Sequence, residues 1–257
     1  MVLPMVYSIS SALKPLDELW LFPPRFFARN PTMKNFSDLF TLMAQSWVPF
    51  LRYVFNTLLI SVLGTGGHVI VASLCAYALA KGNFIGSRIL FAVIVMSLMF
   101  SGAVTGIPNY LIIAKLGWID KYAALIVPAF SGSLGLYLMK QFMETMIPDS
   151  ILDSARIDGA NEWTNFWQIV MPMVKPAWLT LIIFSFQGLW GLGGNIYIYK
   201  EELKTLNYAI SQIISGGLAR AGTGAAAAVI MMILPVTVFV VMQSNIVETM
   251  ATSGMKD

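Results

Sequence analysis

Long apolar stretches alternate with short polar segments along most of this chain. The stretches cover about residues 55–80, 89–114, 123–146, 177–198 and 223–242. Each is close to or above the roughly twenty residues that an α-helix needs to cross a bilayer. Residues 1–13 are apolar but shorter, and we interpret them as the outer half of a first helix in a chain whose start is truncated or assigned late. The pattern predicts an all-α membrane protein, a polytopic bundle of about six transmembrane helices forming one domain over residues 1–257.

The composition agrees with this pattern and excludes several protein classes. Apolar residues make up 57% of the chain and charged residues only 11%, which is typical of an integral membrane protein. The net charge of +3 is small and dispersed, so no nucleic-acid partner is expected. The single cysteine, Cys75, lies inside an apolar stretch, which excludes a disulfide framework and a cysteine metal site.

Two polar segments interrupt the apolar pattern. Residues 14–50 contain several prolines and are predicted to form an external loop, whose aromatic residues suit the lipid interface. Residues 149–172 are predicted to form a helix, a turn and a second helix. Ser150 and Asp153 match a capping box, with Asp149 as an alternative cap, and Gly159 supplies the turn.

The predicted second helix of this segment is amphipathic. It covers Asn161 to Val170, and its apolar residues recur at helical spacing: Trp163, Phe166, Trp167 and Val170. Pro172 and Pro176 are predicted to end it before the next apolar stretch begins. We refer to residues 149–172 as the knob, because the pattern predicts that they project from the membrane domain.

The knob resembles the EAA coupling loop of permease subunits in ABC importers. The family pattern is E-A-A, three residues, G, nine residues and I-x-L-P. The matching residues here are Asp153, Ser154, Ala155, Gly159, Ile169 and Pro172, with Asp158 and Ala160 flanking the glycine as in a common variant. Asp153 replaces the family glutamate, Ser154 the second alanine and Met171 the leucine. Nearly the whole chain resembles the second permease of maltose and multiple-sugar transporters.

This resemblance implies a type I ABC importer permease fold in a prokaryotic plasma membrane, with residues 149–172 on the cytoplasmic side. It implies four kinds of partner: a homologous partner permease, two ATP-binding cassette subunits, an external solute-binding protein and a sugar. ATP and Mg would bind to the cassette subunits, so no cofactor is expected in this chain. Only six of the sixteen Lys and Arg residues lie on the side that would be cytoplasmic, so the orientation rests on the resemblance.

A few polar residues lie inside the apolar stretches. Gln187, Trp190 and Asn195 are candidates for lining a sugar pathway, since amide and indole groups can bond to and stack on a sugar. A hydrogen bond between helices explains them equally well. His68, the single histidine, is interpreted as such an interhelical residue.

The sequence contains no G-x-x-x-x-G-K-[ST] loop and no nucleophile–base pair, which argues against an ATPase or an intramembrane enzyme. The alternative function is that of a secondary transporter or channel that is not coupled to an ATPase. Such transporters usually carry charged residues inside the membrane for ion coupling. The apolar stretches here contain almost none.

Overall fold

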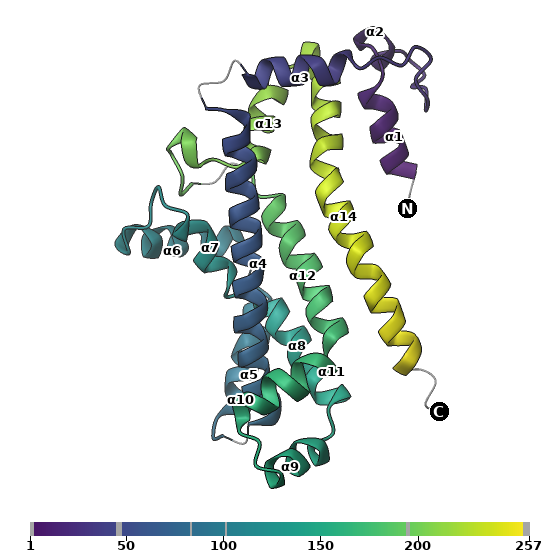
Figure 1. Ribbon diagram of the computed structural model, residues 1–257. Helices are drawn as coiled ribbons and strands as arrows, with labels where there is room; N and C mark the ends of the chain where they lie inside the picture. Colours follow the sequence, from purple (N-terminus) through teal and green to yellow (C-terminus); the bar gives the residue numbers. More distant parts are fainter. Residues whose placement is uncertain (1–2, 45–47, 83, 101, 194–195, 254–257) are drawn as a thin grey trace. The chain divides into compact units, whose positions relative to one another are not determined.

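The computed structural model describes residues 3–44, 48–82, 84–100, 102–193 and 196–253. Every regular element in these ranges is helical, which confirms the predicted all-α class. The chain divides into two compact units, which are described separately. The first unit comprises Met1–Leu59 and Trp190–Val238, and the second comprises Ile60–Leu189 and Phe239–Asp257. Figure 1 labels the helices in chain order.

Three stretches of the described chain are long and apolar enough to cross a membrane. They are α4 (Phe50–Lys81), residues 123–146, which contain α7 (Ala123–Ala129) and α8 (Ser133–Met146), and the part of α14 (Ala221–Ser253) up to Gln243. A fourth span is possible if the bent pair formed by residues 162–173 and 175–190 counts as one. Two prolines lie inside helices, Pro108 in α6 (Gly102–Lys115) and Pro235 in α14.

The predicted third span, 89–114, is two short helices, α5 (Ser87–Ser97) and α6 (Gly102–Lys115). The first helix ends at Ser97, and the second begins at Gly102. Ser97 Oγ donates to the carbonyl oxygen of Ile94 at 2.6 Å, and such competition with the helical backbone bonds is typical of a serine near a helix end. The predicted fifth span also ends early, because α12 (Lys175–Trp190) stops well before residue 198.

The first unit holds residues 14–50, the segment that was predicted to be external. Its helices are α1 (Leu3–Ala12), α2 (Leu16–Leu19), α3 (Lys34–Ala44), the 3₁₀ turns η2 (Glu201–Leu203) and η3 (Leu218–Arg220), α13 (Leu206–Ile214) and the adjoining parts of α4 and α14. An apolar core joins Leu39 and Met43 of α3 to Ile210 of α13 and Ala226 of α14. Residues 14–44, 48–50 and 197–222 are therefore folded segments that contribute buried side chains.

The second unit holds the knob. Its remaining helices are α9 (Asp149–Ile157), α10 (Glu162–Thr164), the π-helix η1 (Asn165–Val170) and α11 (Met171–Met173). Figure 1 shows α9 at one end of this unit, and α10 lies beside the last turns of α4, where Tyr77 contacts Glu162. One continuous apolar core connects α4, α8, the knob and α12, and it includes Ala76, Met139, Leu152, Phe166 and Leu181.

Candidate functional site

The first helix of the knob, α9, begins at Asp149 as expected but without the predicted cap. Pro148 occupies the N-cap position, and no side chain there bonds to the helix. Pro148 has no amide hydrogen for a capping box to satisfy, and its carbonyl oxygen accepts a hydrogen bond from the amide of Ile151 at 3.2 Å. Ser150 is inside the helix, and its carbonyl oxygen accepts a hydrogen bond from Ser154 Oγ at 2.9 Å.

The turn after α9 confirms the structural prediction for Gly159, which has φ of +89°. The amide of Ala160 donates to the Ala155 carbonyl at 2.9 Å, and the amide of Gly159 donates to that of Arg156 at 3.1 Å. This pair of bonds is the Schellman arrangement, which needs a residue in the left-handed region at the position of Gly159. Three residues of the EAA-like motif therefore build one helix end: Ala155, Gly159 and Ala160.

The second helix of the knob is longer and more bent than predicted. Asn161 caps it, because its side-chain oxygen accepts a bond from the Thr164 amide at 2.8 Å. The helix then passes through the π-helical residues 165–170 and continues beyond Pro172 to Met173, so Pro172 does not end it. It meets α12 at an angle of 80°. The bend lies at Val174, between Pro172 and Pro176.

The apolar residues of the knob divide into a buried and an exposed group. Phe166 and Val170 are buried in the core of the second unit, and Ile169 packs against that core. Trp163 and Trp167 were expected on the same face, yet they are 62% and 40% exposed. The π-helical turn widens the spacing of side chains around this helix, so a regular period of 3.6 misassigns them. The exposed group also includes Ile157 of α9, which is 87% exposed.

The exposed charges of the knob form a small network centred on Arg156. Its guanidinium contacts Asp153 Oδ1 at 3.0 Å and Glu162 Oε1 at 2.9 Å, which links the end of α9 to the start of α10. The hydrogen bond to Glu162 raises the pKa of Arg156 above its ordinary value. Asp153 and Asp158 remain exposed to solvent. The knob thus presents large apolar side chains together with carboxylates, a composition suited to contact with another protein.

One buried side chain in the knob lacks hydrogen bonds. Asn165 is completely buried, and neither its amide nitrogen nor its amide oxygen has a partner among the described residues. Sequence patterning did not single out this residue. Its place at the start of a π-helix matters, because such turns are often found at functional sites.

The three candidates for a sugar pathway have different surroundings. Trp190 is 6% exposed, and its indole Nε1 donates to the carbonyl oxygen of Met231 at 2.8 Å, so its polar group has a structural partner. Gln187 is exposed on α12. Asn195 lies outside the described residues. A pathway role for these three residues stays a prediction.

His68 has the interhelical environment that its isolation in an apolar stretch suggested. Its Nε2 atom lies 3.1 Å from the carbonyl oxygen of Gly132, in the break between α7 and α8. A Cβ atom at either Gly132 or Gly135 would overlap the imidazole ring, so these glycines allow the helices to approach. His68 also borders a mainly apolar cavity of about 260 Å³.

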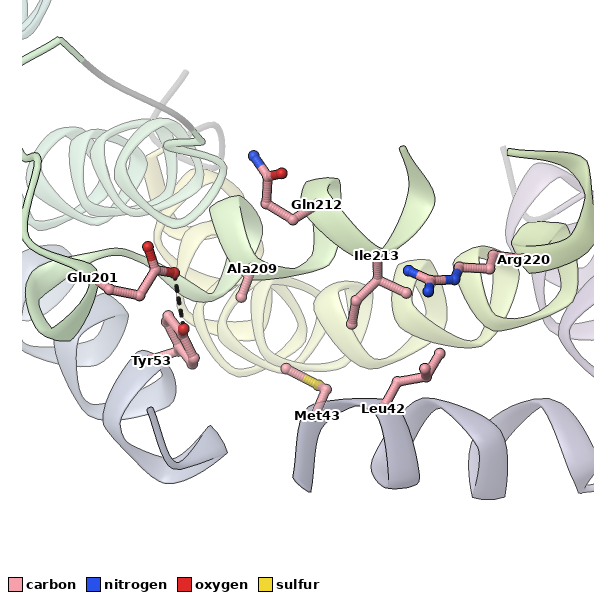
Figure 2. Close-up of a pocket in the computed structure, with 8 residues that line it drawn as sticks. All are labelled: Leu42, Met43, Tyr53, Glu201, Ala209, Gln212, Ile213 and Arg220. Atoms are coloured by element: carbon pink, nitrogen blue, oxygen red, sulfur yellow. Dashed lines mark hydrogen bonds between the residues drawn. The ribbon is translucent and has the colours of Figure 1, made fainter. Parts of the chain in front are cut away.

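A second cavity, of about 190 Å³, lies in the first unit and was not evident from the sequence. Figure 2 shows the Tyr53 hydroxyl hydrogen-bonded to Glu201 near one end, Arg220 at the other, and Met43, Leu42 and Ile213 between them. The Tyr53–Glu201 bond measures 2.9 Å, and Glu201 also pairs with Lys204 at 2.7 Å. The charge of Glu201 is therefore neutralised locally. The cavity can offer apolar contact, hydroxyl and amide hydrogen bonds, and a guanidinium.

Comparison with known proteins shows which family this chain resembles. The family model described as the binding-protein-dependent transport system inner membrane component matches residues 19–251. Protein LplC of Bacillus subtilis (strain 168) is 33% identical over 74% of this chain and 61% of its own length. The polygalacturonan/rhamnogalacturonan transport system permease protein YtcP of the same organism is 30% identical over 78% of this chain and 68% of its own.

A solved structure has the same fold. It is the crystal structure of a bacterial ABC transporter involved in the import of the acidic polysaccharide alginate, and a chain of it matches with a TM-score of 0.77 at 21% identity. The match covers 95% of this chain and 90% of that one. The matched part of the chain spans 61% of the length of LplC. This chain belongs to the family of binding-protein-dependent transport system inner membrane components.

Proposed function

We propose that this chain is a multi-pass permease subunit of an ATP-driven importer in a prokaryotic inner membrane. It pairs with a homologous permease and forms the translocation pathway for a sugar or oligosaccharide. An external solute-binding protein delivers the solute, and two cytoplasmic ATPase subunits, which carry ATP and Mg, supply the energy. Family membership and the saccharide transport named for YtcP support this proposal.

The observation that carries the proposal is the exposed surface of the knob. Ile157 and Trp163 are more than half exposed on a segment that is otherwise folded against a buried core. Exposed large apolar side chains that are rimmed by charges mark protein contact sites. We propose that α9 and α10 insert into a cleft of an ATPase subunit. Closure of the ATPase pair on ATP would then move the knob and convert the pathway between its inward-facing and outward-facing forms.

Co-purification of the ATPase from detergent-solubilised membranes tests this proposal. The full chain is expected to co-purify with an ATPase subunit and a second permease. Ile157→Asp places a charge in the proposed contact and should reduce the recovered ATPase at least about tenfold, which corresponds to 1.4 kcal/mol. The matched control is Leu116→Asp, a position 52% exposed in the loop after α6. If the full chain purifies alone and still transports solute, the uncoupled transporter is the correct function.

We place solute contact in the first unit at the cavity of Figure 2. Gln212 and Arg220 supply hydrogen-bond donors, while Met43 and Ile213 supply an apolar wall, a combination that suits a sugar ring. Arg220→Ala is expected to raise the solute concentration needed for half-maximal uptake without loss of ATPase binding. Unchanged uptake kinetics in this variant would remove the cavity from the pathway.

A further inference from the structure

The last two turns of α4 carry two polar side chains that contact the knob. Tyr77 and Lys81 are four residues apart, so they lie on the same face of the helix. Tyr77 contacts the start of the second knob helix, and Lys81 contacts the start of the first. This arrangement matters because α8 and α12 adjoin the knob along the chain, whereas α4 does not. Only non-covalent contacts can make α4 move together with the knob.

In the contact between Lys81 and the knob, the lysine side chain is largely buried. The side chain is 7% exposed, and Nζ donates to the carbonyl oxygen of Ile147 at 2.6 Å and to Asp149 Oδ1 at 2.8 Å. Ile147 directly follows α8 at its C-cap position, where carbonyl groups lack helical partners. Lys81 therefore fastens α4 to the junction between α8 and α9. Removing the ammonium would leave this carbonyl without its donor.

The contact of Tyr77 reaches both knob helices. Its hydroxyl donates to Glu162 Oε2 at 2.5 Å, and the other oxygen of Glu162 accepts from Arg156 at the end of α9. The tyrosine ring also lies against Phe166, with ring centroids 5.5 Å apart. Tyr77 is therefore bound to α10 directly and to α9 through Arg156.

The space between these two attachments is filled by apolar side chains. Ala76 of α4, Leu152 of α9 and Val170 of the π-helix are each no more than 2% exposed and belong to one core. Close-packed cores transmit displacement because they resist compression. The knob and the last turns of α4 therefore form one packed body.

We infer that Tyr77 and Lys81 are positioning residues that make α4 follow the knob during the transport cycle. The inference rests on the proposed function, since the displacement comes from an ATPase. Lys81 binds the start of α9 and Tyr77 binds the start of α10. Because α4 is held at two points, it moves in the same direction as the knob. Farther along α4, His68 contacts Ser185 of α12 and the carbonyl oxygen of Gly132. A displacement of α4 would therefore reach the junction of α7 and α8.

The test uses the full complex reconstituted in vesicles and measures the amount of solute imported per ATP hydrolysed. Tyr77→Phe and Lys81→Met are expected to retain the ATPase subunits and to hydrolyse ATP. The number of solute molecules moved per ATP should fall about fivefold or more. Lys81→Arg keeps donors for both acceptors and should restore most of the ratio.

The control is Lys140→Met. Lys140 is a comparably buried lysine, with a side chain 10% exposed, whose partner Glu144 lies on the same helix, so the pair does not join α4 to the knob. A purely structural role would lower thermal stability and yield in all of the variants while leaving the ratio of solute to ATP unchanged, and that result would overturn the inference. If Lys81→Met does not assemble, Tyr77→Phe still tests the inference, because it removes only the hydroxyl that bonds to Glu162. Failure of the unaltered chain to bind any ATPase would instead contradict the proposed function.

Discussion

The Nδ1 atom of His68 on α4 lies 2.7 Å from Oγ of Ser185 on α12, a residue 117 positions later in the chain. Gly132 offers only a carbonyl oxygen to the other ring nitrogen, so in the neutral imidazole Nε2 donates and Nδ1 accepts from the serine hydroxyl. The histidine therefore joins α4 to both α12 and the junction of α7 and α8. Each bond uses a group that the membrane interior would otherwise leave unsatisfied.

Ser185→Ala removes the donor to Nδ1 and leaves one nitrogen of the buried His68 imidazole without this partner. We expect the free energy of unfolding of the variant to be lower by about 1–2 kcal/mol, the usual cost of an unsatisfied polar group. Unfolding of the purified protein in detergent measures this difference. Ser185→Thr, which keeps a hydroxyl, serves as the control, and equal loss in both variants would show that shape rather than hydrogen bonding matters here.

Gly159→Val is predicted to distort the turn between the two knob helices. No atom lies near enough to obstruct a side chain, but φ of +89° is a conformation that valine adopts only with strain. The expected cost is about 1–2 kcal/mol of local stability, together with loss of ATP-coupled uptake. Gly66→Ala is the control, because that glycine also has open space around it but has no positive φ. Normal coupling in Gly159→Val would contradict the assigned role of the turn.

Asn165→Leu is predicted to be neutral or stabilising. Both polar atoms of Asn165 lack partners among the described residues, so an apolar side chain of similar size avoids a desolvation cost of about 1–3 kcal/mol. We expect an unchanged or higher midpoint of thermal unfolding. A large decrease would mean that the amide makes hydrogen bonds in the assembled protein.

The attachment of α9 to Lys81 should depend on pH. Lys81 donates a hydrogen bond to the carboxylate of Asp149, and this bond holds the pKa of Asp149 below its ordinary value. The resulting stabilisation is present above the pKa of the unfolded carboxyl, about 3.9, and disappears as the pH falls through the lower folded value. The difference in thermal stability between the unaltered protein and Asp149→Asn should therefore be constant between about pH 8 and pH 5 and shrink below about pH 4.

Asp38→Asn provides the comparison for that experiment, since Asp38 forms no ion pair with another described residue. It reports the effect of replacing an aspartate that lacks this attachment. A difference between the unaltered protein and Asp149→Asn that persists at low pH would mean that the Lys81 contact does not depend on the charge of Asp149.

Local signals in the sequence were reliable where one residue type decides the conformation. Gly159 predicted the turn because glycine alone adopts positive φ without strain, and the structure confirms it at that residue. The long apolar stretches predicted helices because backbone groups in a membrane must satisfy one another within a segment. The start of α9 was placed correctly, although Pro148 rather than Ser150 determines it.

Errors arose where neighbouring elements compete with local preference. Trp163 and Phe166 have the same apolar character, and only the π-helical turn and the contact with α4 decide that one is exposed and the other buried. Residues 89–114 were predicted to form one span, but the structure has two short helices there, one ending at Ser97 and the next beginning at Gly102. Periodicity assumes one regular helix, and it cannot anticipate a change of helix type.

The amino-acid sequence by itself determined the helical membrane class, the place of the knob and its resemblance to a coupling loop, because composition and residue spacing are local properties. Only the tertiary structure brought Lys81 to Asp149, Tyr77 to Glu162 and His68 to Ser185. Each pair joins residues far apart in the chain, and each depends on which faces of the helices pack together. That choice is made by the burial of whole helix surfaces, to which any single residue contributes little.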